Sequence, residues 1–139
     1  MYPKPFHTAI LLTLLLAISC AEPLSTKRFV GGDGPYVFPV DMTDSTAAYD
    51  LDFFTRLDGR EDPPFVELLV RWTSPSDSLF RETVYLPMDG PRRAFSRQIV
   101  QPYRADVRPA EPGVWTLSVS APSKPAGFRG LGLVVRKVK

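Results

Sequence analysis

Cys20 carries the only thiol of the chain, and thiols are the side chains most readily modified covalently. It stands directly behind an apolar run over residues 9–18, which itself follows Lys4 and His7. The run has the length of the hydrophobic region of a secretory signal peptide and is too short for the roughly 20 residues that a transmembrane helix needs. The sequence therefore predicts an export signal over residues 1–19, with Cys20 immediately after it.

Residues 17–20 resemble the lipobox of bacterial lipoproteins, with Ala17 at a position where many bacteria have leucine. The resemblance implies that Cys20 becomes the first residue of the mature chain, with a diacylglycerol on its sulfur and an acyl chain such as palmitate on its amino group. The membrane would then be the first partner of the protein. The alternative is a free or buried cysteine after ordinary signal cleavage.

Cleavage before Cys20 removes 19 of the 139 residues and leaves 120, the usual size of one domain. It also removes Lys4 and His7, so the mature chain has no histidine and carries 16 basic against 15 acidic residues. This charge balance gives no reason to expect nucleic acid as a partner. Without histidine or a free thiol we expect no Ser-His-Asp or Cys-His catalysis and no zinc site. The sequence therefore predicts neither an enzyme nor a cofactor.

Four aspartates form the densest group of carboxylates: Asp41, Asp44, Asp50 and Asp52. Carboxylate oxygens are the ligands that calcium prefers. Their spacing does not match the calcium loop of an EF-hand. The favoured interpretation is therefore that Asp44 lies in a turn, while Asp50 and Asp52 lie on the solvent face of a strand.

Three aromatic residues are candidates for stacking on sugar rings: Trp72, Trp115 and Tyr103. A glycan-binding role requires at least one of these rings to be exposed on a concave face. Trp72 and Trp115 alternate in phase with apolar neighbours in predicted strands, so the favoured interpretation places both indoles in the core.

Five arginines cluster between residues 92 and 108: Arg92, Arg93, Arg97, Arg104 and Arg108. Arg97 and Arg104 are the candidate contacts for a ligand or partner, since guanidinium groups bind the phosphates of lipopolysaccharide or a membrane surface. The favoured interpretation, however, is a solvated run in which charge and proline protect a strand edge from pairing with another chain.

The elements that must position these residues are short strands separated by Pro, Gly, Asp and Ser, without sustained helical periodicity. The predicted strands cover residues 36–40, 49–56, 65–73, 80–86, 95–100, 103–107, 114–120 and 131–137. Residues 65–73 and 80–86 are predicted to form a hairpin, with 65–73 a central strand. Residues 20–35 are predicted to be a lipidated N-terminus and flexible tether. The sequence thus predicts an antiparallel β-sandwich over 36–139, jelly-roll or immunoglobulin-like.

Several segments in order resemble the GldH-like gliding-motility lipoproteins of the Bacteroidota. They are the Tyr-x-Leu-x-Phe strand at 49–53, the strand ending at Ser74 and Pro75, and residues 82–88, 112–116 and 130–133. The resemblance implies a lipid-anchored component of the cell envelope, in the outer membrane, that serves gliding motility and its linked secretion machinery through protein partners. It implies no activity. The alternative is a glycan-binding outer-membrane lipoprotein.

Overall fold

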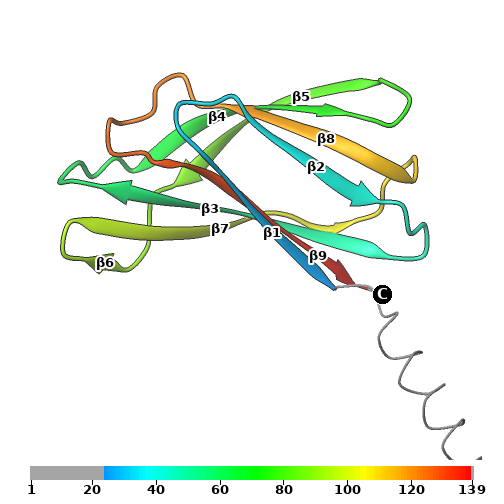
Figure 1. Cartoon of the computed structure of the whole chain (residues 1–139), viewed down its shortest axis with the longest axis horizontal. Helices are drawn as coiled ribbons and strands as arrows, with labels where there is room; N and C mark the ends of the chain where they lie inside the picture. Colours follow the sequence, from blue (N-terminus) through cyan, green and yellow to red (C-terminus); the bar gives the residue numbers. More distant parts are fainter. Residues whose placement is uncertain (1–23, 139) are drawn as a thin grey trace, which may run out of the picture.

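The computed structural model describes residues 24–138, which form nine strands and no helix (Figure 1). The strands are β1 (Ser25–Gly31), β2 (Tyr36–Met42), β3 (Ala48–Asp58), β4 (Phe65–Thr73), β5 (Leu79–Pro87), β6 (Arg92–Arg93), β7 (Ser96–Val107), β8 (Gly113–Ser120) and β9 (Gly130–Val138). The predicted export signal and Cys20 lie outside the described residues. Within residues 24–138 no helix is long and apolar enough to cross a membrane.

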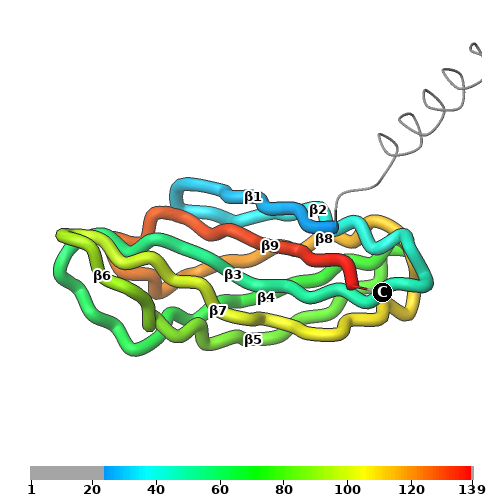
Figure 2. Tube along the Cα trace, turned by 90° about the horizontal axis from the view of Figure 1, so that it is seen from below, coloured from blue at the N-terminus to red at the C-terminus, as the bar shows by residue number. Residues whose placement is uncertain are grey.

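The strands make two antiparallel sheets that pack face to face, as Figures 1 and 2 show from two sides. One sheet has the order β1-β9-β3-β7-β6 and the other β2-β8-β4-β5. Apart from the short β6, the first strand pairs with the last, the second with the second last, and so on inward to the β4–β5 hairpin. This is the jelly-roll pairing of eight strands, so the alternative of an immunoglobulin-like topology is not realised.

The core lies between the sheets and follows from alternation along each strand. In β2, for example, Tyr36, Phe38, Val40 and Met42 are buried and the residues between them are exposed, as a period of two requires. The predicted inward face of β3 is also confirmed, with Leu51 and Phe53 fully buried. The prediction of an all-β sandwich is therefore correct.

The predicted hairpin of residues 65–73 and 80–86 is confirmed as β4 and β5. Strand β4 spans the predicted residues, and it is an internal strand between β8 and β5. Residues 95–100 and 103–107, predicted as two strands, belong to the single strand β7. Pro102 is tolerated inside it because β6 pairs only with Arg97 and Ser96, which leaves the rest of β7 at a sheet edge.

The prediction of a flexible tether over residues 20–35 is wrong for its C-terminal part, because Ser25–Gly31 is the edge strand β1. The strand is held by its pairing with β9 and by Phe29, which lies directly opposite Gly132. The rings of Phe29 and Phe54 lie 5.9 Å apart over that glycine, and Lys27 Nζ lies 4.6 Å from the centre of the Phe54 ring. The glycine-rich residues 32–34 form the turn into β2. The folded domain therefore begins near residue 25.

Candidate functional site

Four of the five residues predicted as ligand or partner contacts meet at one end of the sandwich. Trp72 comes from β4, Tyr103 and Arg104 from β7, and Trp115 from β8. The two indole rings are nearly perpendicular, with centroids 6.2 Å apart, and the Tyr103 ring is stacked on Trp72 at 6.5 Å. We call these residues, together with Phe80 and Glu82 of β5, the aromatic cluster.

A chain of polar contacts joins the two sheets through this cluster. Trp72 Nε1 donates a hydrogen bond of 2.9 Å to Tyr103 Oη, and Tyr103 Oη donates to the carboxylate of Glu82. The guanidinium of Arg104 forms an ion pair with the second oxygen of the same carboxylate. Burial, and then the hydrogen bond to Glu82, raise the pKa of Tyr103 to about 12. The phenol therefore stays neutral at physiological pH and acts as a donor rather than as a base.

An apolar notch of about 230 Å³ opens beside the cluster. It is lined by Met42, Trp72, Phe80, Arg104, Val107, Pro109 and Trp115. Trp115 is only 9 % exposed, and its Nε1 donates a 2.9 Å bond to the carbonyl of Glu111. Trp72 and Tyr103 are half-buried and bonded to each other. The indole of Trp115 lies in the core, as the favoured interpretation places it, whereas Trp72 is only half-buried and packs against the core. Phe80, at 55 %, is a well-exposed ring of the notch.

Arg97, the fifth predicted contact, lies at the opposite end of β7 from the aromatic cluster. Its Nη1 donates a 2.7 Å bond to the carbonyl of Met88, and its Nη2 lies 2.6 Å from a carboxylate oxygen of Asp62. The hydrogen bond from Arg97 holds the pKa of Asp62 below its ordinary value. Arg97 thus ties the segment after β5 and the loop before β4 to the edge of its sheet.

The four aspartates of the candidate calcium group are engaged in separate contacts. Asp41 accepts bonds from Thr43, Asp44 accepts bonds from Thr46, Asp50 accepts the backbone N–H of Asp106, and Asp52 pairs with Arg136. In residues 24–138 there is no group of three or more acidic, histidine or cysteine side chains placed to hold a metal ion. The carboxylates therefore serve turns and strand faces, as the favoured interpretation has it.

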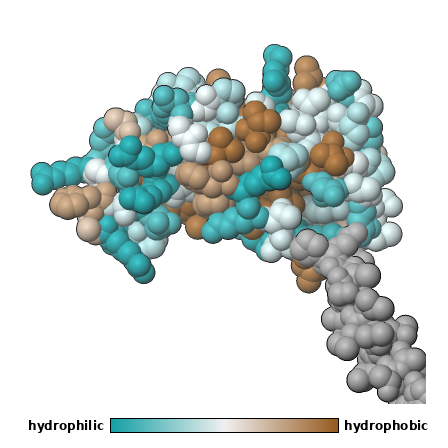
Figure 3. Space-filling model, viewed as in Figure 1, coloured by the Kyte–Doolittle hydropathy of each residue, from teal (hydrophilic) through white to brown (hydrophobic). Residues whose placement is uncertain are grey.

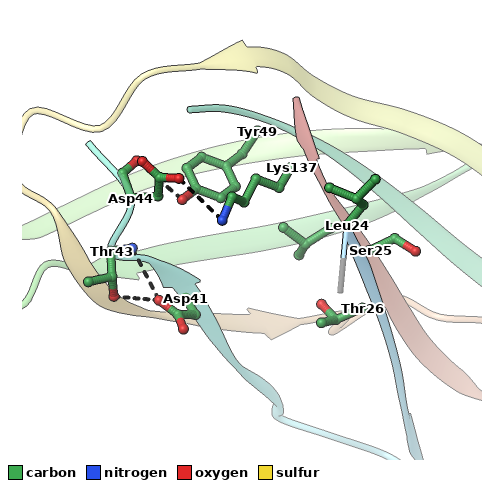
Figure 4. A pocket seen from close by; sticks show the side chains of 9 residues that line it. Leu24, Ser25, Thr26, Asp41, Thr43, Asp44, Tyr49 and Lys137 are labelled. Carbon is green, nitrogen blue, oxygen red and sulfur yellow. Dashed lines mark hydrogen bonds and ion pairs between the residues drawn. The ribbon is translucent and has the colours of Figure 1, made fainter. Parts of the chain in front are cut away.

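A second cavity, of about 430 Å³, lies where the described chain begins (Figure 4). Leu24, Ser25 and Thr26 form one wall, and Tyr49 and Lys137 form another. Lys137 Nζ lies 3.2 Å from a carboxylate oxygen of Asp44. Hydrogen bonds from Thr46 are the main cause that lowers the pKa of Asp44 from 3.8 to about 2, and Lys137 adds to them. Because Leu24 is part of its wall, this cavity lies at the N-terminal end of the described chain.

Two groups of residues were not predicted from the sequence. Phe80 and Glu82 join the aromatic cluster because β5 pairs with β4 and lies against β7, a relation that no local pattern contains. The register of the same hairpin also places Arg71 directly opposite Arg81 on the solvent face. That pairing follows from the five-residue turn at 74–78 and was available from the predicted hairpin.

No protein-family model matches the chain, and no curated protein sequence matches it at a significant level. The resemblance to gliding-motility lipoproteins therefore stays a prediction.

Proposed function

We propose that the protein is a lipid-anchored component of the cell envelope, located in the outer membrane, whose sandwich acts as a structural or protein-interaction module. The observation that carries this proposal is the start of β1 at Ser25, only five residues after Cys20. Five residues span at most about 18 Å even when fully extended. A lipid on Cys20 would therefore hold the folded domain directly at the membrane surface.

The entry end of the sandwich, where β1 begins and β9 ends, would then face the bilayer (Figure 1). Exposed apolar side chains occur at this end: Leu24, Leu79, Phe80 and Val138. Figure 3 shows hydrophobic surface between hydrophilic side chains on the face seen in Figure 1, including surface beside the point where the described chain begins. Apolar groups at this end suit contact with a membrane interface or with a partner held beside it.

A non-catalytic role is supported by the state of the reactive groups. The described residues contain no histidine or cysteine. The half-buried Tyr103 is held neutral, and Glu82 is held by Tyr103 and Arg104. Gliding motility and its linked secretion machinery are the proposed setting because of the resemblance in the strand segments described above.

The lipid anchor is tested by Cys20→Ala in cells fed labelled palmitate. The wild-type protein should be labelled and found in the membrane fraction, and the variant should be unlabelled and released from it. A variant that stays in the membrane fraction would contradict the anchor.

The interaction role is tested by a pull-down from native membranes with a C-terminal tag, with proteins identified by mass spectrometry. Recovery of gliding or secretion components with the wild-type protein, and their loss with Cys20→Ala, is the expected result. Recovery of polysaccharide-uptake proteins instead would support the glycan-binding alternative and contradict the proposal.

A further inference from the structure

The outer face of the β4–β5 hairpin carries two arginines in direct opposition. Arg71 of β4 and Arg81 of β5 are register partners, and both side chains are exposed. Side chains that face each other in this way have Cβ atoms about 5 Å apart, and like charges at that distance destabilise the pair. In residues 24–138 neither guanidinium forms an ion pair with a carboxylate. Within the described residues, the fold therefore places two arginines opposite each other without an ion pair to offset their charge.

Among the described residues that line the cavity around this pair are several hydrogen-bond donors, and the one acid is already bound elsewhere. A shallow cavity of about 570 Å³ is lined by both arginines and by the hydroxyl residues Thr83, Ser118 and Ser120. Glu82 also borders the cavity, but its carboxylate is bound by Tyr103 and Arg104 in the aromatic cluster.

The rest of the hairpin face does not neutralise the pair. Glu67 is opposite Tyr85 and about 13 Å along the strand from Arg71, and Asp77 lies in the turn, four residues before Arg81; within the described residues neither forms an ion pair with the two arginines. The cavity therefore presents two positive charges and three hydroxyl groups to the solvent.

We propose that Arg71 and Arg81 form a binding site for a phosphate group, supplied by inorganic phosphate or by a sugar phosphate. Two guanidinium groups match the charge of a phosphate monoester, which is close to −2 at neutral pH, and each can bind two of its oxygens. Hydroxyls of Ser118 and Thr83 border the same cavity and supply further donors. The volume exceeds that of a phosphate ion, and Leu69 and Pro35 provide an apolar wall on which a sugar ring fits.

This site does not depend on the lipid at Cys20, because all of its residues belong to the described sandwich. A phosphate bound here would offset the repulsion between the two arginines. Binding and stability are therefore expected to be coupled, with phosphate raising the melting temperature.

The test is isothermal titration calorimetry of the mature protein in a non-ionic detergent, with inorganic phosphate, glucose 1-phosphate and glucose as probes. Saturable binding of the two phosphates at one site, and none of glucose, is expected. Tighter binding of glucose 1-phosphate by tenfold or more would assign the sugar phosphate as ligand, and equal binding would assign the phosphate alone. No saturable binding of either phosphate would overturn the proposal.

The matched variants are Arg71→Gln, Arg81→Gln and the control Arg93→Gln, which removes an exposed arginine of β6. Each of the first two should weaken binding at least tenfold, and the control should change it less than twofold. The melting temperature without ligand checks folding, and it should not fall in Arg71→Gln or Arg81→Gln, since each relieves repulsion. If all three variants weakened phosphate binding equally, the loss of one positive charge anywhere on the protein would explain the effect, and the proposed site would be refuted.

Discussion

Replacing Tyr103 by Phe tests whether the aromatic cluster is a structural clamp between the two sheets. The substitution removes one oxygen and keeps the ring, so the stacking on Trp72 and the contact with Phe53, at 4.6 Å between centroids, should persist. What is lost is the acceptor for Trp72 Nε1 and the donor to Glu82. Glu82 keeps its ion pair with Arg104, whereas the half-buried indole N–H loses its partner.

The magnitude follows from these two losses. Leaving a buried donor without a partner costs about 1–3 kcal/mol, and the partial exposure of Trp72 places the expected loss of unfolding free energy at about 1–2 kcal/mol. Tyr85→Phe is the matched control, because Tyr85 is 58 % exposed and its hydroxyl makes no hydrogen bond within the described residues. This control should change the unfolding free energy by less than about 0.5 kcal/mol.

Urea denaturation followed by tryptophan fluorescence measures both variants. For a single domain with a urea dependence of about 2 kcal/mol per molar, Tyr103→Phe should lower the midpoint by about 0.5–1 M. The pH dependence gives a second readout. The pKa of Tyr103 is raised from 10.0 to about 12, so the folded state retains a proton that the unfolded state releases, and wild-type stability should fall as pH rises from 10 to 12. Tyr103→Phe should not show this fall in stability. Equal urea midpoints, and an equal loss of stability between pH 10 and 12, for Tyr103→Phe and Tyr85→Phe would refute the structural clamp.

Two further substitutions test other parts of the fold. Gly132→Ala should lower the free energy of unfolding by about 1–3 kcal/mol, because the added Cβ would lie 2.1 Å from Cζ of Phe54 and push that ring off Phe29. In a protein that also carries Phe54→Leu, the same substitution should lower the free energy of unfolding by less than half as much. Asp44→Asn should make the free energy of unfolding less dependent on pH under acidic conditions. The lowered pKa of Asp44 contributes stability that is present above pH 4 and is lost as the pH falls from about 4 to 2. Urea denaturation at several pH values measures how the free energy of unfolding changes with pH. The same change in the wild type and in Asp44→Asn would show that Asp44 makes no contribution.

Strands could be predicted where apolar and polar residues alternate clearly along the sequence. The order of the strands within each sheet could not be predicted from this alternation. Strand β4 alternates around buried Leu68 and Val70, and the turn that follows has the composition of a hairpin. Strand β1 was missed because only Phe29 and Val30 of its seven residues are apolar, and all but Val30 are exposed. It becomes a strand only through its pairing with β9, about 100 residues later in the chain. Pairing between the first and last strands depends on long-range contacts, which period-two patterns do not encode.

Candidate site residues divide in the same way. Residue type singled out Trp72 and Tyr103 as stacking rings and Arg104 as a phosphate contact, without predicting that the three meet. Their role together depends on Glu82, which reaches them from strand β5. The sequence alone could not distinguish a ring that stacks on a ligand from one that closes the space between two sheets. The two roles differ in whether the indole N–H group donates to another residue of the fold, and this requires the three-dimensional structure.

Both arginines predicted to contact a partner are already engaged within the fold. Arg104 neutralises Glu82 at the β5–β7 edge, and Arg97 is bound to Asp62 and to a backbone carbonyl. A guanidinium held in this way must break an existing ion pair before it can bind a new anion. Within residues 24–138 Arg71 and Arg81 have no such ion pair to break, and like charges in direct opposition destabilise the strand pair. For this reason anion binding is expected on the outer face of the four-stranded sheet rather than at Arg97 or Arg104.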